Sequence, residues 1–462
     1  MSTDTTHPGE ADEDVAYHED LEMYPEFNKF QYKMYRDFAE ADGIKWGGSG
    51  WAYESLPEGL GDDVYFLAGE PYGAVVAYNE EISREFLNAA DQHGIPNDMC
   101  GYMLNEWGGI IEDKYVLPDG TTYDYFPEVD FNFTSHICCT HSKWYQYNSE
   151  LEAEFSGDDD EQPPFNAIDV MGGPNAYEDE QIVDYKVQQA HQAIDWMQEE
   201  TGRDFDDERF INAVKNEMEG MSYWAKTMEL QKNDPAPLEE RRMFSLYVPS
   251  IARRTLDRSA QLYEDLYEEV KDKAERNATV TGPQKFRFIS DSPPPWAHLD
   301  VYKYMRDNYG AVSLGSLYSW GLTGIWRGFD GGDEWDWEAM DTPMERGVDL
   351  DDRETAVREM IKWNLRRPSW NVFSTHLDAR VEITRQMAEQ FDVDFVLVHL
   401  NRGCEGWAQN QTEVSNALKE AGIPVLEYEG NQADTRDFDP SELRQKIDSF
   451  MEGRFGVEAQ NE

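Results

Sequence analysis

Basic residues are scarce in this sequence. The 462 residues include 40 lysines and arginines against 94 aspartates and glutamates, which gives a formal charge of −54. A phosphate backbone binds to a basic surface, so this imbalance argues against a nucleic-acid partner, and an anionic membrane surface would repel the chain. No stretch approaches the roughly 20 apolar residues of a membrane helix, and the acidic N-terminus has no apolar signal segment. We therefore expect a soluble, cytoplasmic protein.

Cysteine is also scarce. Four cysteines in a chain of this length cannot form a disulfide scaffold, and the lack of a CxxC pair argues against a structural zinc site. The common motifs of nucleotide binding and hydrolysis are missing as well. There is no Walker A sequence, no GxGxxG loop and no GxSxG elbow. We therefore expect no nucleotide bound in a P-loop of this chain.

Apolar and aromatic residues are plentiful, at 40% and 13% of the chain, so general disorder is excluded despite the charge. The acidic residues are spread along the whole sequence. At low ionic strength a charge of this size destabilises the compact state, whereas at about 1 M salt the Debye length shrinks to roughly 3 Å. We expect a protein adapted to the high-salt cytoplasm of a halophile, which unfolds below moderate salt. The alternative is an acidic protein that binds calcium or a basic partner.

Four regions are predicted. Residues 1–20 are expected to form a disordered acidic extension. Residues 21–177 alternate short apolar strands with helical segments, as parallel α/β units do. Residues 178–277 have helical periodicity almost throughout, and residues 278–462 return to the alternation. The sequence thus predicts an α/β fold of two Rossmann-like, doubly wound parallel-sheet units joined by a helical layer.

Within these regions, individual segments predict particular helices, strands and loops. We expect a helix over 23–38, a strand and turn from Val64, and a helix over Ser83–His93 that is ended by Gly94. The segment VDFNFTSHICC reads as a strand that ends at cysteines and precedes a helix. The second unit is expected to open at KFRFISD, to include DFVLVHLNRGCEGW, a helix over Gln411–Ala421 and IPVLEYEG, and to carry GFDGGDEWDWEAMDTP as an acidic loop. The residue sequence shows no recognisable internal repeat.

The cysteines lie near predicted strand ends. Cys138 and Cys139 follow one strand, Cys404 follows a strand of the second unit, and Cys100 precedes a helical segment. Ligands bind beyond the carboxyl ends of strands in open α/β sheets, so these loops can converge on the cleft between the units and hold a metal cluster there. The alternative is that each thiol is a small buried hydrophobic group, which a free cysteine more often is. Adjacent side chains point apart, so Cys138 and Cys139 are not expected to bind one metal together.

Four histidines lie near the same region of the predicted fold. His136 and His141 flank the cysteine pair, and His298 and His399 lie near strand ends. A lone histidine is more often a hydrogen-bonded structural group. Beside a cluster, a histidine can instead donate protons or tune the reduction potential.

Several dispersed strings carry a family resemblance: SHICCTHSKWYQ, HLNRGCEG, EGNQADTRDFD, RQKIDSFME, GLGDDVYFLAGEPYG, MFSLYV, SDSPPPW and GSLYSWGLTGIW. Through them the chain resembles the superfamily of 2-hydroxyacyl-CoA dehydratases, including the 2-hydroxyglutaryl-CoA dehydratase D-component, and benzoyl-CoA reductases. It looks most like the larger cluster-binding subunit of the class I, ATP-dependent benzoyl-CoA reductases. The resemblance extends from about residue 24 to residue 456. The acidic tail and the acidic loops depart from the family, as salt adaptation requires.

The resemblance implies an iron–sulfur cofactor. In that family three cysteines hold a [4Fe-4S] cluster whose fourth iron has no cysteine ligand. Carried over to this sequence, the ligands are Cys100, Cys138 and Cys404, with Cys139 as the alternative to Cys138. A CxxxxK pattern that ends at Lys143 favours Cys138.

The resemblance also implies an activity and partners. The expected reaction is the ferredoxin-driven, two-electron reduction of benzoyl-CoA, or a related aromatic acyl-CoA, to a cyclohexadiene-carbonyl-CoA, as in anaerobic degradation of aromatic compounds. The expected partners are a smaller homologous cluster-binding subunit, ATPase activator subunits and ferredoxin. His136 and His298 are candidate proton donors. Lys143 and Arg402 are candidates for binding CoA phosphates, with a solvated surface position as the equal alternative.

Two other functions stay open. The first is a 2-hydroxyacyl-CoA dehydratase subunit that uses the same cluster and activator and removes water without net reduction. The second, of a different class, is a non-catalytic scaffold or an electron-transfer subunit for a catalytic sister chain. A structural zinc protein is the remaining alternative.

Overall fold

The computed structural model describes residues 16–155, 162–169, 172–330, 332–373 and 376–460. Most of the predicted acidic extension, residues 1–15, lies outside these ranges. The first described element is the two-residue strand β1 (Tyr17–His18), which pairs in parallel with β8 (Ala278–Thr279). No helix in the described part of the chain is long and apolar enough to cross a membrane.

The N-terminal half is built on a four-stranded parallel sheet. Its strands are β2 (Ile44–Gly48), β3 (Val64–Ala68), β6 (Phe131–Ser135) and β7 (Phe165–Ile168), in the order β3-β2-β6-β7. Most of their residues are apolar and most are buried, which is typical of parallel strands that are covered on both faces. Aromatic side chains join neighbouring strands, since Trp46 of β2 stacks on Phe66 of β3 with 3.8 Å between ring centroids.

The C-terminal half repeats this arrangement. Its strands are β9 (Phe286–Asp291), β10 (Ala311–Ser316), β13 (Phe395–Asn401) and β14 (Val425–Gly430), in the order β10-β9-β13-β14. In both sheets the first strand along the chain lies between the second and the third, and the fourth strand is at the edge. The α/β prediction is therefore confirmed, and the two halves share a topology that the sequence did not reveal as a repeat.

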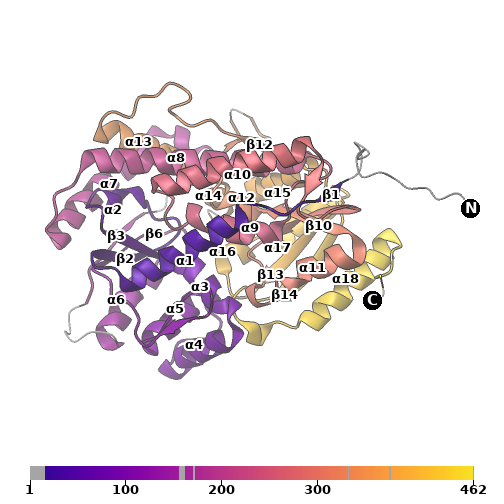
Figure 1. Cartoon of the computed structure of the whole chain (residues 1–462), viewed down its shortest axis with the longest axis horizontal. Helices are drawn as coiled ribbons and strands as arrows, with labels where there is room; N and C mark the ends of the chain where they lie inside the picture. Colours follow the sequence, from indigo (N-terminus) through magenta and orange to yellow (C-terminus); the bar gives the residue numbers. More distant parts are fainter. Residues whose placement is uncertain (1–15, 156–161, 170–171, 331, 374–375, 461–462) are drawn as a thin grey trace, which may run out of the picture.

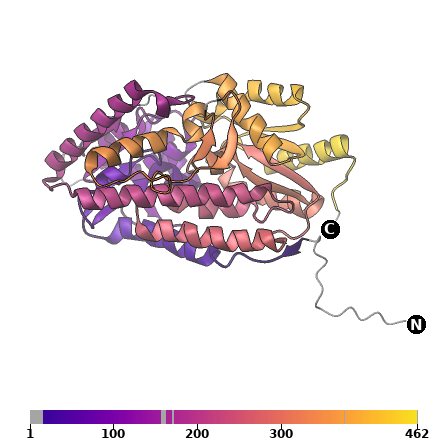
Figure 2. The ribbon, with the colours of Figure 1, turned by 90° about the horizontal axis from the view of Figure 1, so that it is seen from above.

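Long helices connect the two halves. They are α7 (Glu180–Thr201), α8 (Asp207–Glu229), the short α9 (Glu240–Leu246) and α10 (Asp257–Glu275). Figures 1 and 2 show α8 and α10 side by side along the length of the molecule, over both sheets. Aspartates begin two of them, because Asp179 and Asp206 accept backbone N–H groups at the first turns of α7 and α8. This layer fixes the two sheets relative to each other.

Shorter elements surround the sheets. In the N-terminal half these are α1 (Tyr24–Glu40), α2 (Ser55–Glu58), α3 (Gly69–Tyr78), α4 (Glu80–His93), α5 (Gly101–Ile111), α6 (Trp144–Phe155), β4 (Tyr115–Val116) and β5 (Thr122–Tyr123). In the rest of the chain they are α11 (Asp300–Tyr309), α12 (Leu317–Gly321), β11 (Trp326–Gly328), β12 (Asp336–Ala339), α13 (Arg353–Leu365), α14 (Pro368–Phe373), α15 (Leu377–Gln390), α16 (Glu405–Ala408), α17 (Gln411–Glu420) and α18 (Pro440–Phe455). Single 3-10 turns are η1 (Ala176–Glu178), η2 (Leu230–Lys232), η3 (Val248–Ser250), η4 (Trp296–His298) and η5 (Thr435–Asp437).

Two local predictions were wrong. The residues after the strand at Val64 form the buried helix α3, where a turn was predicted, because the apolar run GAVVAY packs against α5. The predicted acidic loop in the C-terminal half contains a strand, β12, which pairs antiparallel with β11. Burial of Trp335 and Trp337 explains it, since both indoles pack inside the molecule while the acidic side chains face outward.

Candidate functional site

The cysteine loops leave equivalent strands of the two sheets. Cys138 stands three positions after Ser135, the last residue of β6, and Cys404 stands three positions after Asn401, the last residue of β13. Each strand is the third of its sheet. Cys100 is the residue that precedes α5. Three loops from two sheets therefore carry the thiols.

The structure brings these thiols together. Burial raises the pKa of Cys100 well above its ordinary range, and a charge on Cys404 raises it further. A hydrogen bond with Cys139, burial, and charges on Cys404 and Cys100 raise the pKa of Cys138. Burial raises the pKa of Cys404 to about 12. Because their charges interact, these cysteines lie in one common region of the structure.

Close packing holds the loops around that site. A Cβ atom added at Gly406 would lie 3.4 Å from the Cβ of Cys138, and one added at Gly403 would lie 2.3 Å from the Asn431 side chain. Gln432, in the loop after β14, donates to the carbonyl of Gly403 at 3.1 Å and lies 3.8 Å from the Cys100 sulfur. Gln432 thus connects the Cys100 loop to the Cys404 loop.

Cys139 has a different environment from its neighbour. Its side chain is exposed, and its Sγ lies 2.5 Å from Oε2 of Glu405, at the start of α16. The hydrogen bond with Cys138 lowers its pKa, although burial and Glu405 oppose that shift. Cys139 therefore faces outward, whereas Cys138 faces Cys100 and Cys404.

The donor set fits an iron–sulfur cluster better than a single ion. Among the described residues no group of three or more His, Cys, Asp or Glu side chains is placed to hold one metal ion. A [4Fe-4S] cluster needs a different arrangement of ligands. Each cysteine binds a separate iron atom, so the three sulfur atoms do not surround one common position. Three thiols in a largely buried site provide the ligands that such clusters use.

A buried carboxylate–imidazole pair lies beside the thiols. Glu70, in the first turn of α3, places Oε1 2.5 Å from Nε2 of His141, and its Oε2 accepts the Gly50 N–H at 2.9 Å. Both side chains are buried, and Nδ1 of His141 has no hydrogen-bond partner among the described residues. The negative charge of Glu70 contributes to the raised pKa of Cys100. Oε1 of Glu70 likewise has no hydrogen-bond partner among the described residues, so the pair places two unsatisfied polar atoms beside the thiols.

A chain of tyrosine hydroxyls leads away from the cysteines. Tyr102 lies two residues after Cys100, and its hydroxyl is 3.2 Å from that of Tyr318, which accepts a hydrogen bond from Tyr247 at 3.0 Å. Trp296 donates its indole N–H to Tyr102 at 2.6 Å. The rings are buried, and burial raises the pKa of each tyrosine well above its ordinary value. The chain is therefore a set of neutral hydrogen-bond donors and acceptors.

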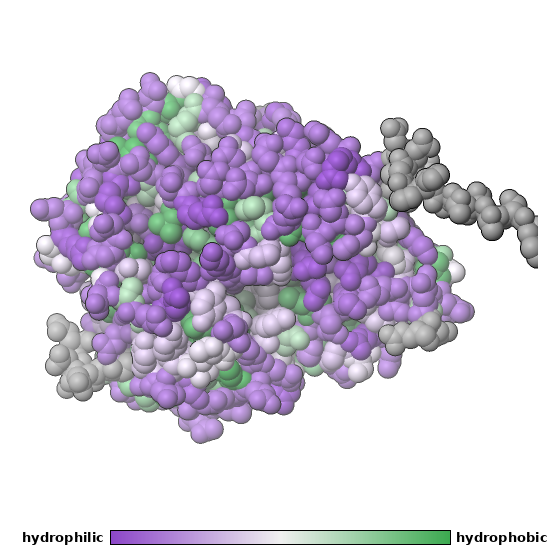
Figure 3. Space-filling model, in the orientation of Figure 1, coloured by the Kyte–Doolittle hydropathy of each residue, from purple (hydrophilic) through white to green (hydrophobic). Residues whose placement is uncertain are grey.

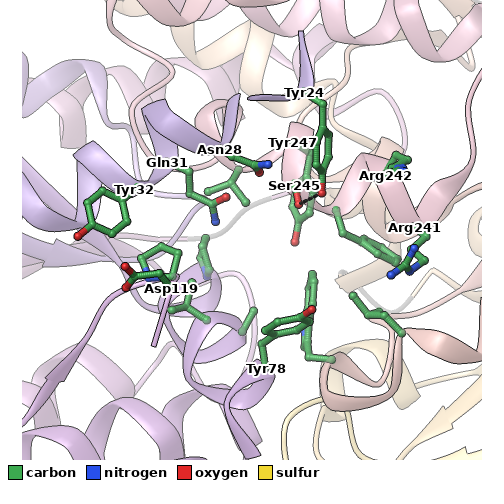
Figure 4. A pocket seen from close by; sticks show the side chains of 18 residues that line it. Tyr24, Asn28, Gln31, Tyr32, Tyr78, Asp119, Arg241, Arg242, Ser245 and Tyr247 are labelled. Atoms are coloured by element: carbon green, nitrogen blue, oxygen red, sulfur yellow. Dashed lines mark hydrogen bonds between the residues drawn. The ribbon is translucent and has the colours of Figure 1, made fainter. Parts of the chain in front are cut away.

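The tyrosine chain ends at a pocket of about 400 Å³. Side chains of α1, α3 and α9 line it together with the loop between β4 and β5 and the turn η4, and Tyr247 and Trp296 form part of its wall. Figure 4 shows Arg241 and Arg242 along one side and Tyr32 and Asp119 on the other. In Figure 3 the face of the molecule that carries α1 is mostly hydrophilic, with paler and green side chains around a hollow near its middle.

The sequence-predicted proton donors lie in two different places. His136 has Nδ1 3.7 Å from Asp169, and burial lowers its pKa. His298 stacks on Phe438 with 4.9 Å between ring centroids, and burial lowers its pKa as well. No cysteine is among the main charged groups that shift the pKa of His136 or His298. By contrast, charges on other cysteines do raise the pKa values of Cys100 and Cys138. His141, which the sequence placed beside the cysteine pair, is the histidine that pairs with a buried carboxylate.

The two candidate phosphate-binding residues are separate from the pocket. Lys143 is exposed and donates to the side-chain carbonyl of Gln146 at 3.2 Å. Arg402 is exposed, forms an ion pair with Glu429, and lines a second, polar cavity of about 430 Å³. The structure does not bring these two residues together. Sequence analysis did not identify Glu70, Tyr247 or Arg241 as site residues. The sequence feature that could have indicated Glu70 is its position shortly after the buried strand β3.

Comparison with known proteins assigns a family to this architecture. The family model for the 2-hydroxyglutaryl-CoA dehydratase D-component matches residues 72–453. The chain is 21% identical to the (R)-phenyllactyl-CoA dehydratase alpha subunit of Clostridium sporogenes, over 87% of this chain and 88% of that protein. It is 23% identical to the (R)-2-hydroxyisocaproyl-CoA dehydratase alpha subunit of Clostridioides difficile, over 87% and 89%. The lactoyl-CoA dehydratase subunit alpha of Anaerotignum propionicum is 25% identical, over 80% and 81%.

Proposed function

The chain belongs to the 2-hydroxyglutaryl-CoA dehydratase D-component family, and we propose that it is the alpha-type, cluster-binding subunit of a 2-hydroxyacyl-CoA dehydratase. The similarity extends over most of the chain and most of each relative. The observation that carries the proposal is the common site of Cys100, Cys138 and Cys404.

The relatives named above are dehydratase subunits. They support the superfamily predicted from the sequence motifs, and within it they favour the dehydratase alternative over the benzoyl-CoA reductase that the motifs indicated first. An enzymatic role likewise has more support than a scaffold role, because the whole family match is to subunits of enzymes.

We assign the cluster ligands to Cys100, Cys138 and Cys404. Cys138 is favoured over Cys139 because charges on both Cys404 and Cys100 raise its pKa, whereas Cys139, whose charge also acts on Cys404, is exposed and bonds to Glu405. When bound, a [4Fe-4S] cluster supplies a centre for one-electron transfer whose potential depends on charge, hydrogen bonds and exposure. Gln432 is positioned to donate to the Cys100 sulfur and so to adjust that potential.

The Glu70–His141 pair serves the proton chemistry. Removal of water from a 2-hydroxyacyl thioester requires a proton for the departing hydroxyl group, and Oε1 of Glu70 and Nε2 of His141, two buried atoms 2.5 Å apart, are positioned to supply it. General acids of this kind contribute about 10² to 10⁴ in rate. The Gly50 N–H fixes the carboxylate from its other oxygen.

Partners are proposed with the function. We propose a second, homologous cluster-binding subunit, an ATPase activator and a low-potential donor such as ferredoxin, because the sequence has no P-loop with which to couple ATP itself. The exposed Cys139–Glu405 edge of the thiol site lies at the surface, where an electron donor has access.

The test uses the native complex, purified without oxygen in molar salt and supplied with ATP and a low-potential reductant. A dehydratase converts a 2-hydroxyacyl-CoA into an unsaturated acyl-CoA with no net consumption of electrons. Loss of benzoyl-CoA with two electrons consumed per molecule would establish the reductase instead. Turnover of neither substrate class by a complex with full iron content would reject both activities.

A further inference from the structure

The carbonyl group of Gly50 accepts hydrogen bonds from two buried arginines. Arg254, which lies between η3 and α10, donates to it from Nη1 at 3.2 Å, and Arg367, which lies between α13 and α14, donates from Nη1 at 3.3 Å. Each of these side chains is only 1% exposed. Gly50 itself belongs to the loop after β2. The N-terminal half, the helical layer and the C-terminal half therefore meet at one backbone carbonyl.

The N–H group of Gly50 bonds to the carboxylate of Glu70. It donates to Oε2 at 2.9 Å, and Oε1 of the same carboxylate lies 2.5 Å from Nε2 of His141. Gly50 is also tightly packed, since a Cβ atom added to it would lie 2.2 Å from Cγ2 of Ile251. Because both polar groups of this residue are bonded, a shift of its carbonyl also shifts the donor that orients Glu70.

Two buried carboxylates accompany the arginines. Glu217 of α8 lies 3.1 Å from Nε of Arg254 and 3.8 Å from Nη2 of Arg367, and Glu54 lies 3.5 Å from Nη1 of Arg254. Burial raises the pKa of Glu54 to about 7. For Glu217 the effect of burial is outweighed by the two arginines and by hydrogen bonds, which lower its pKa.

The charges of this cluster are therefore unequal below pH 7. Glu54 is then mostly neutral, so that two guanidinium groups face the single ionised carboxylate of Glu217. The excess positive charge lies against the carbonyl of Gly50, which the arginines hold. Buried ion pairs contribute little to stability compared with apolar side chains of similar volume, which favours a role in fixing the position of this loop.

Building on the proposed function, in which Glu70 and His141 supply a proton, we infer that Arg367, together with Arg254, is a positioning residue for that pair. The guanidinium groups fix the carbonyl of Gly50, and its N–H group fixes Oε2 of Glu70, so that Oε1 stays directed at His141. Such positioning matters for the rate, because misplacement of a reacting group by about 1 Å can lower it about 10²-fold.

The test is the Arg367→Met variant in the native complex with its cluster, in molar salt at pH 6.5. This variant leaves Arg254 paired with Glu217, so no buried charge loses its only partner. We expect kcat for the 2-hydroxyacyl-CoA to fall about 10- to 100-fold with KM and iron content unchanged. Arg367→Lys, which retains the charge, should recover most of the loss. A fall in iron content, or a lysine variant no better than methionine, would overturn the inference.

A double substitution distinguishes positioning of Glu70 from a general effect on the fold. In a Glu70→Gln background, Arg367→Met should lower kcat by less than about twofold, because the carboxylate that Arg367 positions is already gone. Independent effects would multiply instead and would overturn the inference. Arg287→Met is the matched control and should leave kcat unchanged. Arg287 is also a buried arginine bonded to backbone carbonyls, but it lies near the start of β9, at the opposite end of the sheet from the cysteine loops.

Amide hydrogen exchange gives a second measurement that needs no turnover. In Arg367→Met the peptide that contains Gly50 should exchange about tenfold faster, whereas Arg287→Met should leave its exchange unchanged. Unchanged exchange in Arg367→Met, or faster exchange with a wild-type kcat, would overturn the inference. Faster exchange in a complex whose wild type turns over no 2-hydroxyacyl-CoA would reject the proposed activity and retain the hold of Arg367 on Gly50.

Discussion

Cys138 and Cys404 occupy equivalent positions in two sheets of the same topology. Each follows the last residue of the third strand by three positions, and charges on Cys404 and Cys100 raise the pKa of Cys138. The carboxyl ends of the two sheets therefore meet at the thiols. This relationship gives the cysteines their common location although 266 positions separate Cys138 from Cys404 in the sequence.

The two adjacent cysteines are expected to differ in iron binding. Cys138→Ser removes a thiol that faces Cys100 and Cys404, so iron and acid-labile sulfide should fall from about four of each per chain to near zero. Cys139→Ser is the matched control and should retain both, because that side chain is exposed and bonds to Glu405. The reverse result, measured on protein purified without oxygen, would assign the ligand to Cys139.

Replacement of Glu70 by glutamine should slow turnover without removing the cluster. The substitution keeps the size of the side chain and removes the carboxylate that pairs with His141, so we expect kcat to fall by about 10² or more at constant iron content. Glu81→Gln, on the exposed side of α4, is the control. An unchanged kcat would exclude Glu70 from proton transfer.

Loss of the Tyr318 hydroxyl should separate chemistry from binding. Tyr318→Phe interrupts the hydrogen bonds between Tyr247 and Tyr102 while keeping the ring. We expect a lower kcat and an unchanged Kd for the 2-hydroxyacyl-CoA substrate, whereas Tyr125→Phe, which removes a hydroxyl bonded to the carbonyl of Ala39, should change neither. A weaker Kd with normal kcat would assign Tyr318 to binding alone.

Stability should fall as the pH rises from about 5 to about 8. Burial raises the pKa of Glu106 from 4.5 to about 8, so the folded state binds more protons than the unfolded state across this interval. The free energy of unfolding then decreases by at most about 1.4 kcal/mol per pH unit for this group. In denaturant titrations in molar salt, Glu106→Gln should flatten this dependence, and Glu112→Gln on the exposed end of the same helix should not. A wild-type slope in Glu106→Gln would contradict the assignment.

Dilution of salt should unfold the protein. At −54 the acidic groups repel one another, and the Debye length grows from roughly 3 Å at 1 M salt to roughly 10 Å at 0.1 M. The helical far-UV CD signal should decrease on dialysis from molar KCl into dilute buffer and return when KCl is restored. An osmolyte without charge, such as sucrose, should restore it less well. A spectrum that does not change on dialysis would remove the argument for salt adaptation.

The strands and the positions of Cys138 and Cys404 shortly after them were accessible from the sequence because both depend on local patterns. Apolar runs such as FVLVHLN predict buried parallel strands, and a cysteine shortly after such a run predicts a thiol at a strand end. The prediction of a turn at Gly69 failed because glycine and proline opened a helix there whose apolar face packs on α5. Tertiary packing, which no local pattern contains, decided that segment.

The pocket and the proton pair were not predictable in this way. Tyr24, Tyr78 and Arg241 meet only after α1, α3 and α9 have packed together, and nothing in the spacing of these residues indicates that they share a cavity. His141 stood beside the cysteines in the sequence, but its partner Glu70 is 71 positions away. Long-range pairs of this kind follow from the shared topology of the two sheets, which the sequence does not display.

The helix α8 has a consequence for assembly of the cofactor. Glu217 accepts the hydroxyl of Ser55 at 2.6 Å in the N-terminal half, and Trp224 of the same helix donates to the carbonyl of Ser319 at 3.1 Å in the C-terminal half. The single helix α8 thus holds the two halves together through contacts that involve no metal. Because these contacts involve no cysteine, we expect the two halves to stay joined when a cluster is removed chemically, so that iron and sulfide can rebuild it without unfolding of the chain.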